Sequence, residues 1–250
     1  MVGPIERYLL DKIKVDGSIH MTLIDPEKVT AQGAATVAES GKKSGTAAIM
    51  IGGSTVASQK QLDDVVKAIK VAVKVPTILF PGNVSGISSF ADAIWFMSML
   101  NSTDPYFLMG AQILGAPYIK RFGIEPISMG YIIVGDGGTA GRVGKAIPVP
   151  YSNPKLAADH ALAGQYLGMR FIYLEGGSGT ATPVPPEVIR EVKKAIEVPL
   201  IVGGGIRTKD AASAAADAGA DIVVTGNLTE SSDANERISQ IIEAIKRPRA

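Results

Sequence analysis

Three apolar runs near the end of the chain each lead into glycines: FIYLEGGSGT (171–180), PLIVGGGIRT (199–208) and DIVVTGN (221–227). Each run has the length and composition of a short buried strand. The glycines allow the backbone to bend sharply and turn its N–H groups toward an anion, which suits a phosphate group. Three such loops, separated by predicted helices, are typical of the phosphate site shared by the late strands of a (β/α)8 barrel.

Strand and helix patterns alternate along the rest of the chain. Strands are predicted at 18–25, 46–53, 75–82, 92–99, 127–135, 170–177, 199–205 and 221–227. Helical length and periodicity cover 29–44, 58–73, 105–122, 154–168, 185–196, 208–219 and 234–246. This order predicts a parallel sheet, and eight strands favour closure into a TIM barrel. We expect one α/β domain over residues 1–250.

One repeat unit is irregular. Between the third and fourth predicted strands the chain has only the segment GNVSGISSFA (82–91), which is too short and too rich in Gly and Ser for an ordinary covering helix. We therefore expect the third helix of the barrel to be replaced by a short irregular segment. A gap should then open in the outer ring of helices beside the fourth strand.

Composition limits the classes of partner and compartment. The 250 residues include 25 Lys+Arg and 24 Asp+Glu, so a net charge of +1 gives no broad attraction to nucleic acid. Cys is absent, which excludes disulfides and thiol chemistry. The opening MVGPIERYLLDK does not resemble a signal peptide, and no uncharged stretch suits a membrane span. We expect a cytoplasmic protein without a transmembrane segment.

The first candidate for chemistry is Asp25, which ends the first predicted strand in LIDPEK. Pro26 keeps it out of helical geometry at the barrel mouth, where TIM-barrel active sites lie. A carboxylate that faces a phosphate needs a cation between them, and Mg²⁺ suits this because it accepts one or two carboxylates along with water and phosphate oxygens. We expect Asp25 to bind Mg²⁺, with Ser54 and Asn83 at the next two strand ends completing a polar rim. The alternative is that all three are helix-cap or turn residues.

The second candidate is Glu175, which ends the sixth predicted strand directly before a glycine cluster. A carboxylate so close to a bound phosphomonoester is well placed to act as a general base. Alternatively, it only orients a substrate hydroxyl or pairs with Arg207. Tyr173 shares its strand face and is either a hydrogen-bond donor to the same site or a core residue. The two histidines, His20 and His160, lie in a predicted strand and helix without a catalytic motif, so we interpret them as structural.

A family resemblance runs over nearly the whole chain and rests on six segments: LIDPEK, GGS, PGNVSGIS, YLEGGSGT, VGGGIRT and VVTGN. Together they resemble the geranylgeranylglyceryl phosphate synthase and PcrB-like prenyltransferases. The resemblance implies transfer of a prenyl group from a prenyl diphosphate, most simply geranylgeranyl diphosphate, to the 3-hydroxyl of sn-glycerol 1-phosphate. That reaction forms the first ether bond of archaeal-type membrane lipids, with Mg²⁺ bound to the diphosphate.

The resemblance also implies roles for individual residues. Asp25 and Ser54 would bind Mg²⁺ and diphosphate, while Glu175 and Tyr173 would hold the glycerol. The phosphate cradle would consist of Gly176, Gly177, Ser178, Gly179, Gly203, Gly204, Gly205, Gly226 and Asn227.

The prenyl tail needs an apolar path, which the gap beside 82–91 would supply. The predicted helix 105–122 is rich in small and aromatic residues and would form its wall, unless those residues serve close helix packing or an oligomer contact. Trp95, the only tryptophan, would be the floor that limits tail length if its strand face looks toward the groove; otherwise it is core. We also expect a homo-oligomer that contacts the membrane peripherally when it delivers its lipid product.

Two other functions suit phosphate-binding barrels. An isomerase or aldolase of phosphosugars is one, although an aldolase would need a strand-end Lys, and none is found. A flavin-phosphate-binding barrel is the other, because such barrels use similar glycine loops. The segment GDGGTAGRVG (135–144) lacks the spacing of a nucleotide loop, and we do not interpret it as one.

Overall fold

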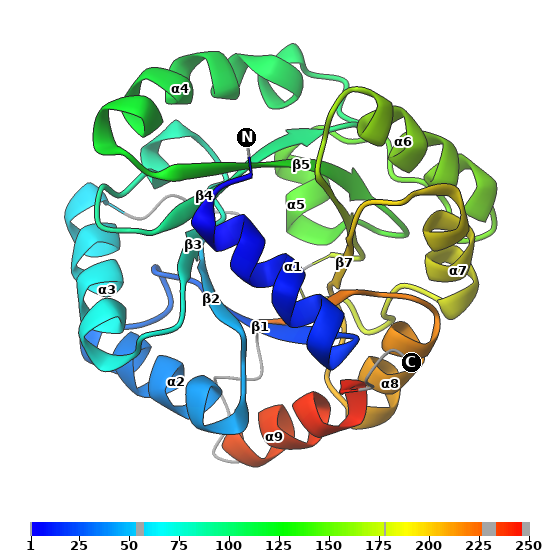
Figure 1. The fold of residues 1–250 in the computed structure, drawn as a ribbon. Helices are drawn as coiled ribbons and strands as arrows, with labels where there is room; N and C mark the ends of the chain where they lie inside the picture. The colour runs from blue at the N-terminus through cyan, green and yellow to red at the C-terminus, as the bar shows by residue number, and fades with distance from the viewer. Residues whose placement is uncertain (1, 54–57, 178, 227–233, 247–250) are drawn as a thin grey trace.

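The computed structural model describes residues 2–53, 58–177, 179–226 and 234–246. Its strands form a closed parallel barrel in chain order, with the first strand pairing with the eighth (Figure 1). The predicted TIM barrel is therefore confirmed, and the predicted strands and helices are all present within a few residues of their expected ends.

The strands are β1 (Ile19–Ile24), β2 (Ala48–Ile51), β3 (Thr77–Leu79), β4 (Ala93–Met99), β5 (Glu125–Ile133), β6 (Phe171–Glu175), β7 (Leu200–Gly203) and β8 (Ile222–Thr225). The α-helices are α1 (Pro4–Asp16), α2 (Ala31–Ser44), α3 (Gln59–Ala72), α4 (Ala111–Phe122), α5 (Gly138–Val143), α6 (Pro154–Tyr166), α7 (Pro186–Ala195), α8 (Lys209–Asp217) and α9 (Ala234–Ile245). A 3₁₀ turn, η1 (Val84–Gly86), and a π-helical turn, η2 (Tyr106–Gly110), complete the described elements.

Side-chain caps fix the starts of several outer helices. The Thr30 hydroxyl accepts a hydrogen bond from the N–H of Gly33 at the start of α2, and Ser58 and Thr208 cap α3 and α8 in the same way. Such caps satisfy backbone donors that have no partner within the helix. Each helix therefore begins at a defined point above its strand, which fixes the loops of the barrel mouth.

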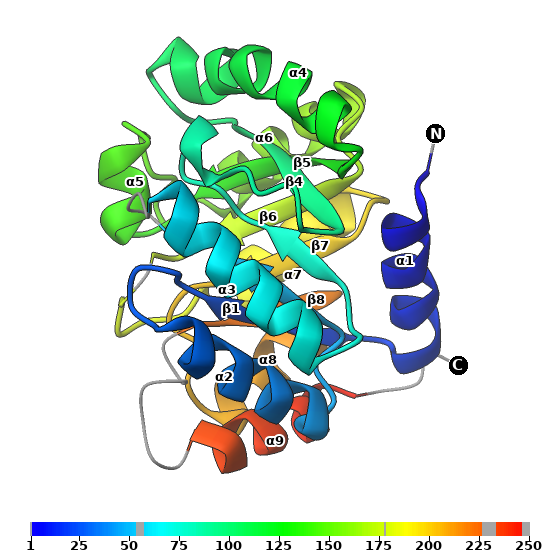
Figure 2. The same ribbon diagram turned by 90° about the vertical axis from the view of Figure 1, so that its left-hand side faces the viewer.

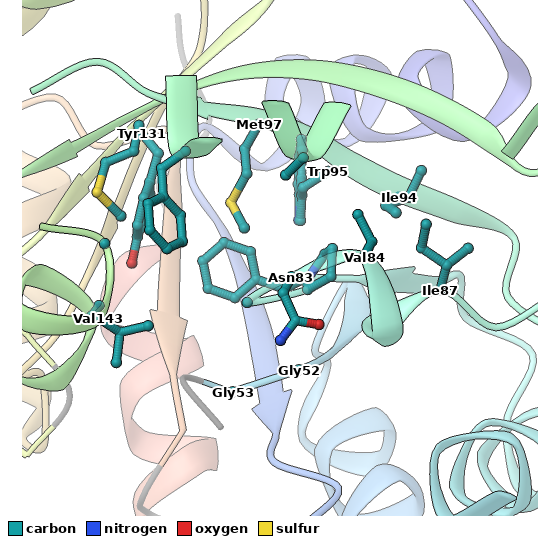
Figure 3. Close-up of a pocket in the computed structure, with 18 of the residues that line it drawn as sticks. Gly52, Gly53, Asn83, Val84, Ile87, Ile94, Trp95, Met97, Tyr131 and Val143 are labelled. Carbon is teal, nitrogen blue, oxygen red and sulfur yellow. The ribbon is translucent and has the colours of Figure 1, made fainter. Parts of the chain in front are cut away.

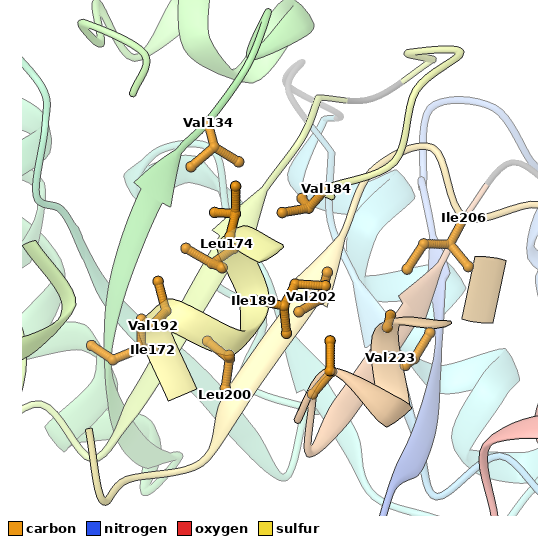
Figure 4. Close-up of a cluster of buried hydrophobic side chains, with 14 of the residues drawn as sticks. Val134, Ile172, Leu174, Val184, Ile189, Val192, Leu200, Val202, Ile206 and Val223 are labelled. Carbon is orange, nitrogen blue, oxygen red and sulfur yellow. The ribbon is translucent and has the colours of Figure 1, made fainter. Parts of the chain in front are cut away.

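Alternate strand residues fill two apolar regions. Side chains that point inward, among them Met21, Met50, Ile78, Trp95, Met129 and Phe171, pack the barrel interior. Side chains that point outward pack under the helices: Figure 4 shows Val202 of β7 and Val223 of β8 beside Ile189 of α7. This period of two is the pattern expected of strands covered on both faces.

The irregular third unit is confirmed. The three-residue turn η1 lies between β3 and β4, where the other units have a full helix. Asn83 begins this turn, because its side-chain oxygen accepts hydrogen bonds from the N–H and hydroxyl of Ser85 at 2.8 and 2.6 Å. Ile87, just after the turn, packs on Gly115 of α4. The ring of helices is therefore thin between α3 and α4.

Helix α1 was not predicted, because the alternation of strands and helices requires no helix before β1. It lies at the end of the barrel away from α5 (Figure 2). The Glu125 carboxylate accepts hydrogen bonds from the first turn of α1, at the N–H of Ile5 (2.7 Å) and of Glu6 (2.8 Å). Glu6 itself is buried and pairs with the Arg170 guanidinium at 2.7 Å. These contacts close the end of the barrel opposite the predicted active site.

His20 has the structural role expected of it. Its ring is buried on the outer side of β1, with Nδ1 3.0 Å from the Thr46 hydroxyl and Nε2 2.8 Å from the Thr225 hydroxyl. Burial lowers its pKa to about 3, so the ring is neutral at physiological pH. The network joins β1 and β8 directly before Gly226.

Candidate active site

Two cavities meet at the mouth of the barrel. The larger, of about 300 Å³, extends from the strand ends toward β4 and α4 (Figure 3). The smaller, of about 70 Å³, lies over the ends of β7 and β8 and is bounded by Gly204, Gly205 and Arg207. Glu175 borders both cavities, together with Leu23 and Gly226. One carboxylate therefore lies at the junction of a large cavity and a small, glycine-lined one.

The carboxylate of Glu175 is buried and held by three donors. Its Oε1 accepts a hydrogen bond from the N–H of Gly177 at 2.7 Å, and its Oε2 accepts one from the Tyr131 hydroxyl at 3.1 Å. Tyr173 provides a further hydrogen bond. Burial raises the pKa of Glu175 above its usual 4.5, although the three hydrogen bonds oppose that rise. The group is thus a fixed carboxylate with increased proton affinity, as a general base requires.

Two tyrosines support this carboxylate. Tyr131 of β5 and Tyr173 of β6 are neighbours in the sheet register, and their rings meet edge to face with centroids 5.2 Å apart. Phe80 stacks on Tyr173 at 5.5 Å. Burial, with the Glu175 charge beside them, raises the pKa of both tyrosines well above 10, so they remain hydrogen-bond donors. Tyr173 is both a core residue and a partner of Glu175, whereas Tyr131 was not predicted from the sequence.

The glycine loops have the backbone geometry that their sequence predicts. Gly177, Gly204 and Gly205 have φ values of +110°, +87° and +74°, which other residues rarely adopt. A Cβ at Gly204 would lie 2.6 Å from the Gly177 nitrogen and 2.7 Å from Glu175 Oε1. These glycines therefore permit two loops to approach each other around the carboxylate.

The other residues of the predicted cradle have mixed outcomes. Gly179, Gly204, Gly205 and Gly226 line the small cavity. Gly203 packs against Tyr173, since a Cβ there would lie 2.0 Å from its hydroxyl, and Gly176 packs near Tyr151 and Val184. Ser178 and Asn227 lie outside the described residues.

Arg207 lines the small cavity as a cation that the sequence prediction did not include in the cradle. Its guanidinium donates a hydrogen bond to the Gly179 carbonyl at 3.1 Å. Among the interactions of the described residues, none pairs it with Glu175, so the ion pair considered above is not formed. Its position two residues after the glycines of IVGGGIRT was the available signal for a phosphate contact.

Asp25 lies on the other side of the mouth and borders the large cavity. Its Oδ1 accepts a hydrogen bond from the N–H of Glu27 at 3.1 Å, and its Oδ2 is 4.0 Å from Lys28 Nζ. A Cβ at Gly53 would lie 2.7 Å from the carboxylate carbon of Asp25. Any larger residue at this position would therefore displace the Asp25 carboxylate. Ser54, its predicted partner, lies outside the described residues.

These residues fit a Mg²⁺ ion that is shared with a substrate. Over the described part of the chain, no three His, Cys, Asp or Glu side chains are grouped as in an all-protein metal site. One or two carboxylates in an open cavity are instead typical of Mg²⁺ that keeps water and phosphate oxygens as its other ligands. Asp25 would provide such a carboxylate.

The wall of the large cavity is mainly apolar. Val84 and Ile87 come from the η1 region and Ile94, Trp95 and Met97 from β4 (Figure 3). Helix α4 and the preceding turn contribute Phe107, Ala111, Gln112, Gly115 and Ile119. The predicted wall is therefore present, although Ala116 and Tyr118 of the same helix are exposed on the opposite side.

Trp95 belongs both to the cavity and to the core. Its side chain is 1% exposed and meets Phe171 edge to face, with ring centroids 5.2 Å apart. It also borders the large cavity, where its indole Nε1 has no hydrogen-bond partner among the described residues. Trp95 is therefore a core residue that also lies where the predicted floor would be.

Helix α5 is a further feature that the sequence interpretation missed. It follows β5 within GDGGTAGRVG, and Thr139, Ala140, Val143 and Gly144 line the large cavity. The segment lacks the spacing of a nucleotide loop, so the sequence interpretation gives it no role. Its place directly after a strand end was the signal, because all such loops meet at the barrel mouth.

Comparisons with known proteins identify the family of this chain. The model of the PcrB family matches residues 11–245. The geranylgeranylglyceryl phosphate synthase of Thermococcus gammatolerans is 52% identical over 98% of this chain and 96% of that protein, and the one from Pyrococcus abyssi is 53% identical over 98% of each. A crystal structure of (S)-3-O-geranylgeranylglyceryl phosphate synthase from Thermoplasma acidophilum, in complex with its substrate sn-glycerol-1-phosphate, has a TM-score of 0.94 and 44% identity, covering 98% of this chain and 99% of that one. The chain belongs to the PcrB family.

Proposed function

We propose that this protein is a geranylgeranylglyceryl phosphate synthase, which joins a prenyl diphosphate to the 3-hydroxyl of sn-glycerol 1-phosphate. The observation that carries the proposal is the buried Glu175 carboxylate at the junction of the two cavities. The small cavity, with its glycines and Arg207, suits a phosphomonoester, and the large apolar cavity suits a prenyl chain. Such a junction brings a hydroxyl and an allylic carbon together at a base.

In this proposal, glycerol 1-phosphate lies with its phosphate against Gly204, Gly205 and Gly226 and its 3-hydroxyl at Glu175. The hydroxyl oxygen forms a bond to C1 of the prenyl group, and the bond from C1 to the diphosphate oxygen breaks. Glu175 accepts the hydroxyl proton, and the leaving group departs as diphosphate. Hydrogen bonds from Tyr131 and from the Gly177 N–H hold the carboxylate in place during this transfer.

The residues around Asp25 would hold Mg²⁺ in the same proposal. The bound ion would neutralise charge on the diphosphate and so favour its departure. Gly53 leaves room for the Asp25 carboxylate, and the Lys28 ammonium adds positive charge close to it. Both residues border the large cavity, so the polar head of the donor would lie near them while its tail extends toward Trp95.

The decisive experiment is a transfer assay with radiolabelled sn-glycerol 1-phosphate and prenyl diphosphates of increasing length, with and without Mg²⁺. We expect a labelled, organic-soluble ether product that depends on Mg²⁺ and forms best with geranylgeranyl diphosphate. If no prenyl diphosphate gives such a product, the proposed function is wrong. A yellow purified protein would instead favour the flavin alternative.

Two further properties belong to this proposal and have separate tests. The absence of Cys supports a cytoplasmic location, and fractionation of cells that express the protein would test it. Self-association is supported by Tyr166 and Leu167 at the end of α6, whose side chains are 78% and 77% exposed although both are large and apolar. Light scattering on the purified protein should give a mass above the 26.0 kDa of one chain.

A further inference from the structure

Helix α4 presents apolar side chains to solvent as well as to the protein. Ile113, Leu114 and Tyr118 are 65%, 54% and 53% exposed, and Met109 in the preceding turn is 60% exposed. On the inner side, Gly115 and Ile119 are buried against the cavity. A helix that is apolar on both sides is normally covered on both sides. In Figures 1 and 2 no other element lies outside α4, so its outer side has no cover within the described chain.

Helix α7 of the outer ring does not share this feature. Helix α7 buries Val188, Ile189 and Val192, and its remaining residues include Glu187, Arg190, Glu191, Lys193 and Lys194. That alternation of buried apolar and exposed charged residues is the usual pattern of a helix in a barrel ring. Helix α3 exposes Val71, and α6 exposes Leu156 and Tyr166, so the exposed apolar side chains of α4 and its preceding turn form a larger group than those of either helix.

Charge distinguishes the kind of partner that this side of α4 would accept. From 105 to 123 the chain contains no acidic residue, whereas the last turn of α4 carries Lys120 and Arg121, both exposed. An apolar helix side that ends in bases, with a tyrosine among the apolar residues, matches the boundary of a bilayer with anionic headgroups. No described helix is long and apolar enough to cross a membrane, so such contact would be peripheral.

We propose that the outer side of α4 docks on the surface of an anionic lipid bilayer. The proposal rests on the proposed function, because the inner side of the same helix lines the cavity assigned to the prenyl tail. Docking there would turn the thin part of the helix ring, between η1 and α4, toward the lipid. A product with a prenyl tail and an anionic phosphate could then move from the cavity into the bilayer without crossing water.

The test is flotation of the full-length protein with vesicles of phosphatidylcholine alone or mixed with equal phosphatidylglycerol. We expect binding to the anionic vesicles that weakens with salt. Ile113→Ser/Leu114→Ser should lower the vesicle partition coefficient about tenfold or more, since two aliphatic side chains no longer enter the lipid. Lys120→Gln/Arg121→Gln should abolish the preference for anionic vesicles. The control Val15→Ser/Val71→Ser removes two valines of α1 and α3 that are 68% and 84% exposed, and should bind as the wild type does.

Several outcomes would overturn the proposal. They are a wild type that does not float with anionic vesicles, equal binding by the Ile113→Ser/Leu114→Ser variant, and an equal loss in the Val15→Ser/Val71→Ser control. If the wild type does not bind vesicles and the Ile113→Ser/Leu114→Ser variant has a lower oligomer mass, the outer side of α4 is a contact between copies of this chain. Prenyl transfer without vesicles is measured in parallel. Vesicle binding without transfer would contradict the proposed function alone, and transfer without vesicle binding would contradict docking alone.

Discussion

Replacement of Glu175 by Gln is the most direct test of the site. The amide keeps the size and shape of the side chain, and its oxygen can still accept the hydrogen bond from the Gly177 N–H. Its NH₂ group can donate a hydrogen bond to the Tyr131 hydroxyl oxygen. The tyrosine can accept that hydrogen bond if its own hydroxyl hydrogen turns away. The variant should therefore fold and bind glycerol 1-phosphate, but it cannot accept the proton of the 3-hydroxyl.

The expected loss follows from these contacts. Removing a general base costs about 10² to 10⁴ in kcat. The stability of the variant should not fall at pH 7. Burial raises the Glu175 pKa in the folded protein, so ionisation of this carboxyl costs stability as the pH rises above its pKa in the unfolded chain. The amide removes this effect. We expect an unchanged or higher Tm, unchanged calorimetric affinity for glycerol 1-phosphate and a large fall in kcat.

A second buried carboxylate gives a matched control. Glu6 is 1% exposed and pairs with Arg170 at the far end of the barrel. Because Arg170 is partly exposed, Glu6→Gln should cost about 2 kcal/mol of stability, or roughly 4 to 8 °C in Tm, while kcat stays the same. A Glu175→Gln enzyme with kcat within about threefold of wild type would refute the base role, and a change in KM alone would make Glu175 a positioning residue.

Four further substitutions test neighbouring parts of the structure. Asp25→Asn should remove most turnover at limiting Mg²⁺ yet leave glycerol 1-phosphate binding intact, and more than about half the activity remaining would contradict metal binding by Asp25. Tyr131→Phe removes a hydrogen bond that lowers the Glu175 pKa, so the acidic limb of the kcat–pH profile should move to higher pH; an unmoved limb would contradict this coupling. Trp95→Ala should admit donors longer than geranylgeranyl diphosphate if the indole is the floor of the cavity, whereas core packing alone predicts a loss of about 3 to 5 kcal/mol with an unchanged ranking by kcat/KM. Burial lowers the His20 pKa from 6.5 to about 3, so between these pH values only the unfolded chain binds a proton at this ring. The free energy of unfolding should therefore fall by about 1.4 kcal/mol per pH unit below pH 6.5. His20→Asn should flatten the decline of Tm from pH 7 to 5, and equal slopes in the two proteins would contradict this.

The sequence predicted those parts of the site that depend on strand ends. Asp25, Glu175 and the glycines follow apolar runs directly, and parallel strands in a barrel bring all such ends to one mouth. Local pattern and fold class together were therefore sufficient for them. Tyr131 differs, because it lies within β5 and reaches Glu175 only through the register that pairs Tyr131 with Tyr173 and Ile133 with Glu175. That register is a property of the closed barrel, which no local pattern contains.

The absence of a third covering helix links the two halves of the proposed chemistry. A full helix over β3 and β4 would cover the space where Ile87 now meets Gly115, and it would close the large cavity on that side. The glycines proposed to bind phosphate lie at the ends of β6, β7 and β8, away from this opening, and those units keep their helices and their apolar packing. One side of the mouth thus carries the glycine loops and Arg207, and the other side is mainly apolar. A polar acceptor and a long apolar donor can therefore reach Glu175 from different directions, so neither has to leave before the other binds.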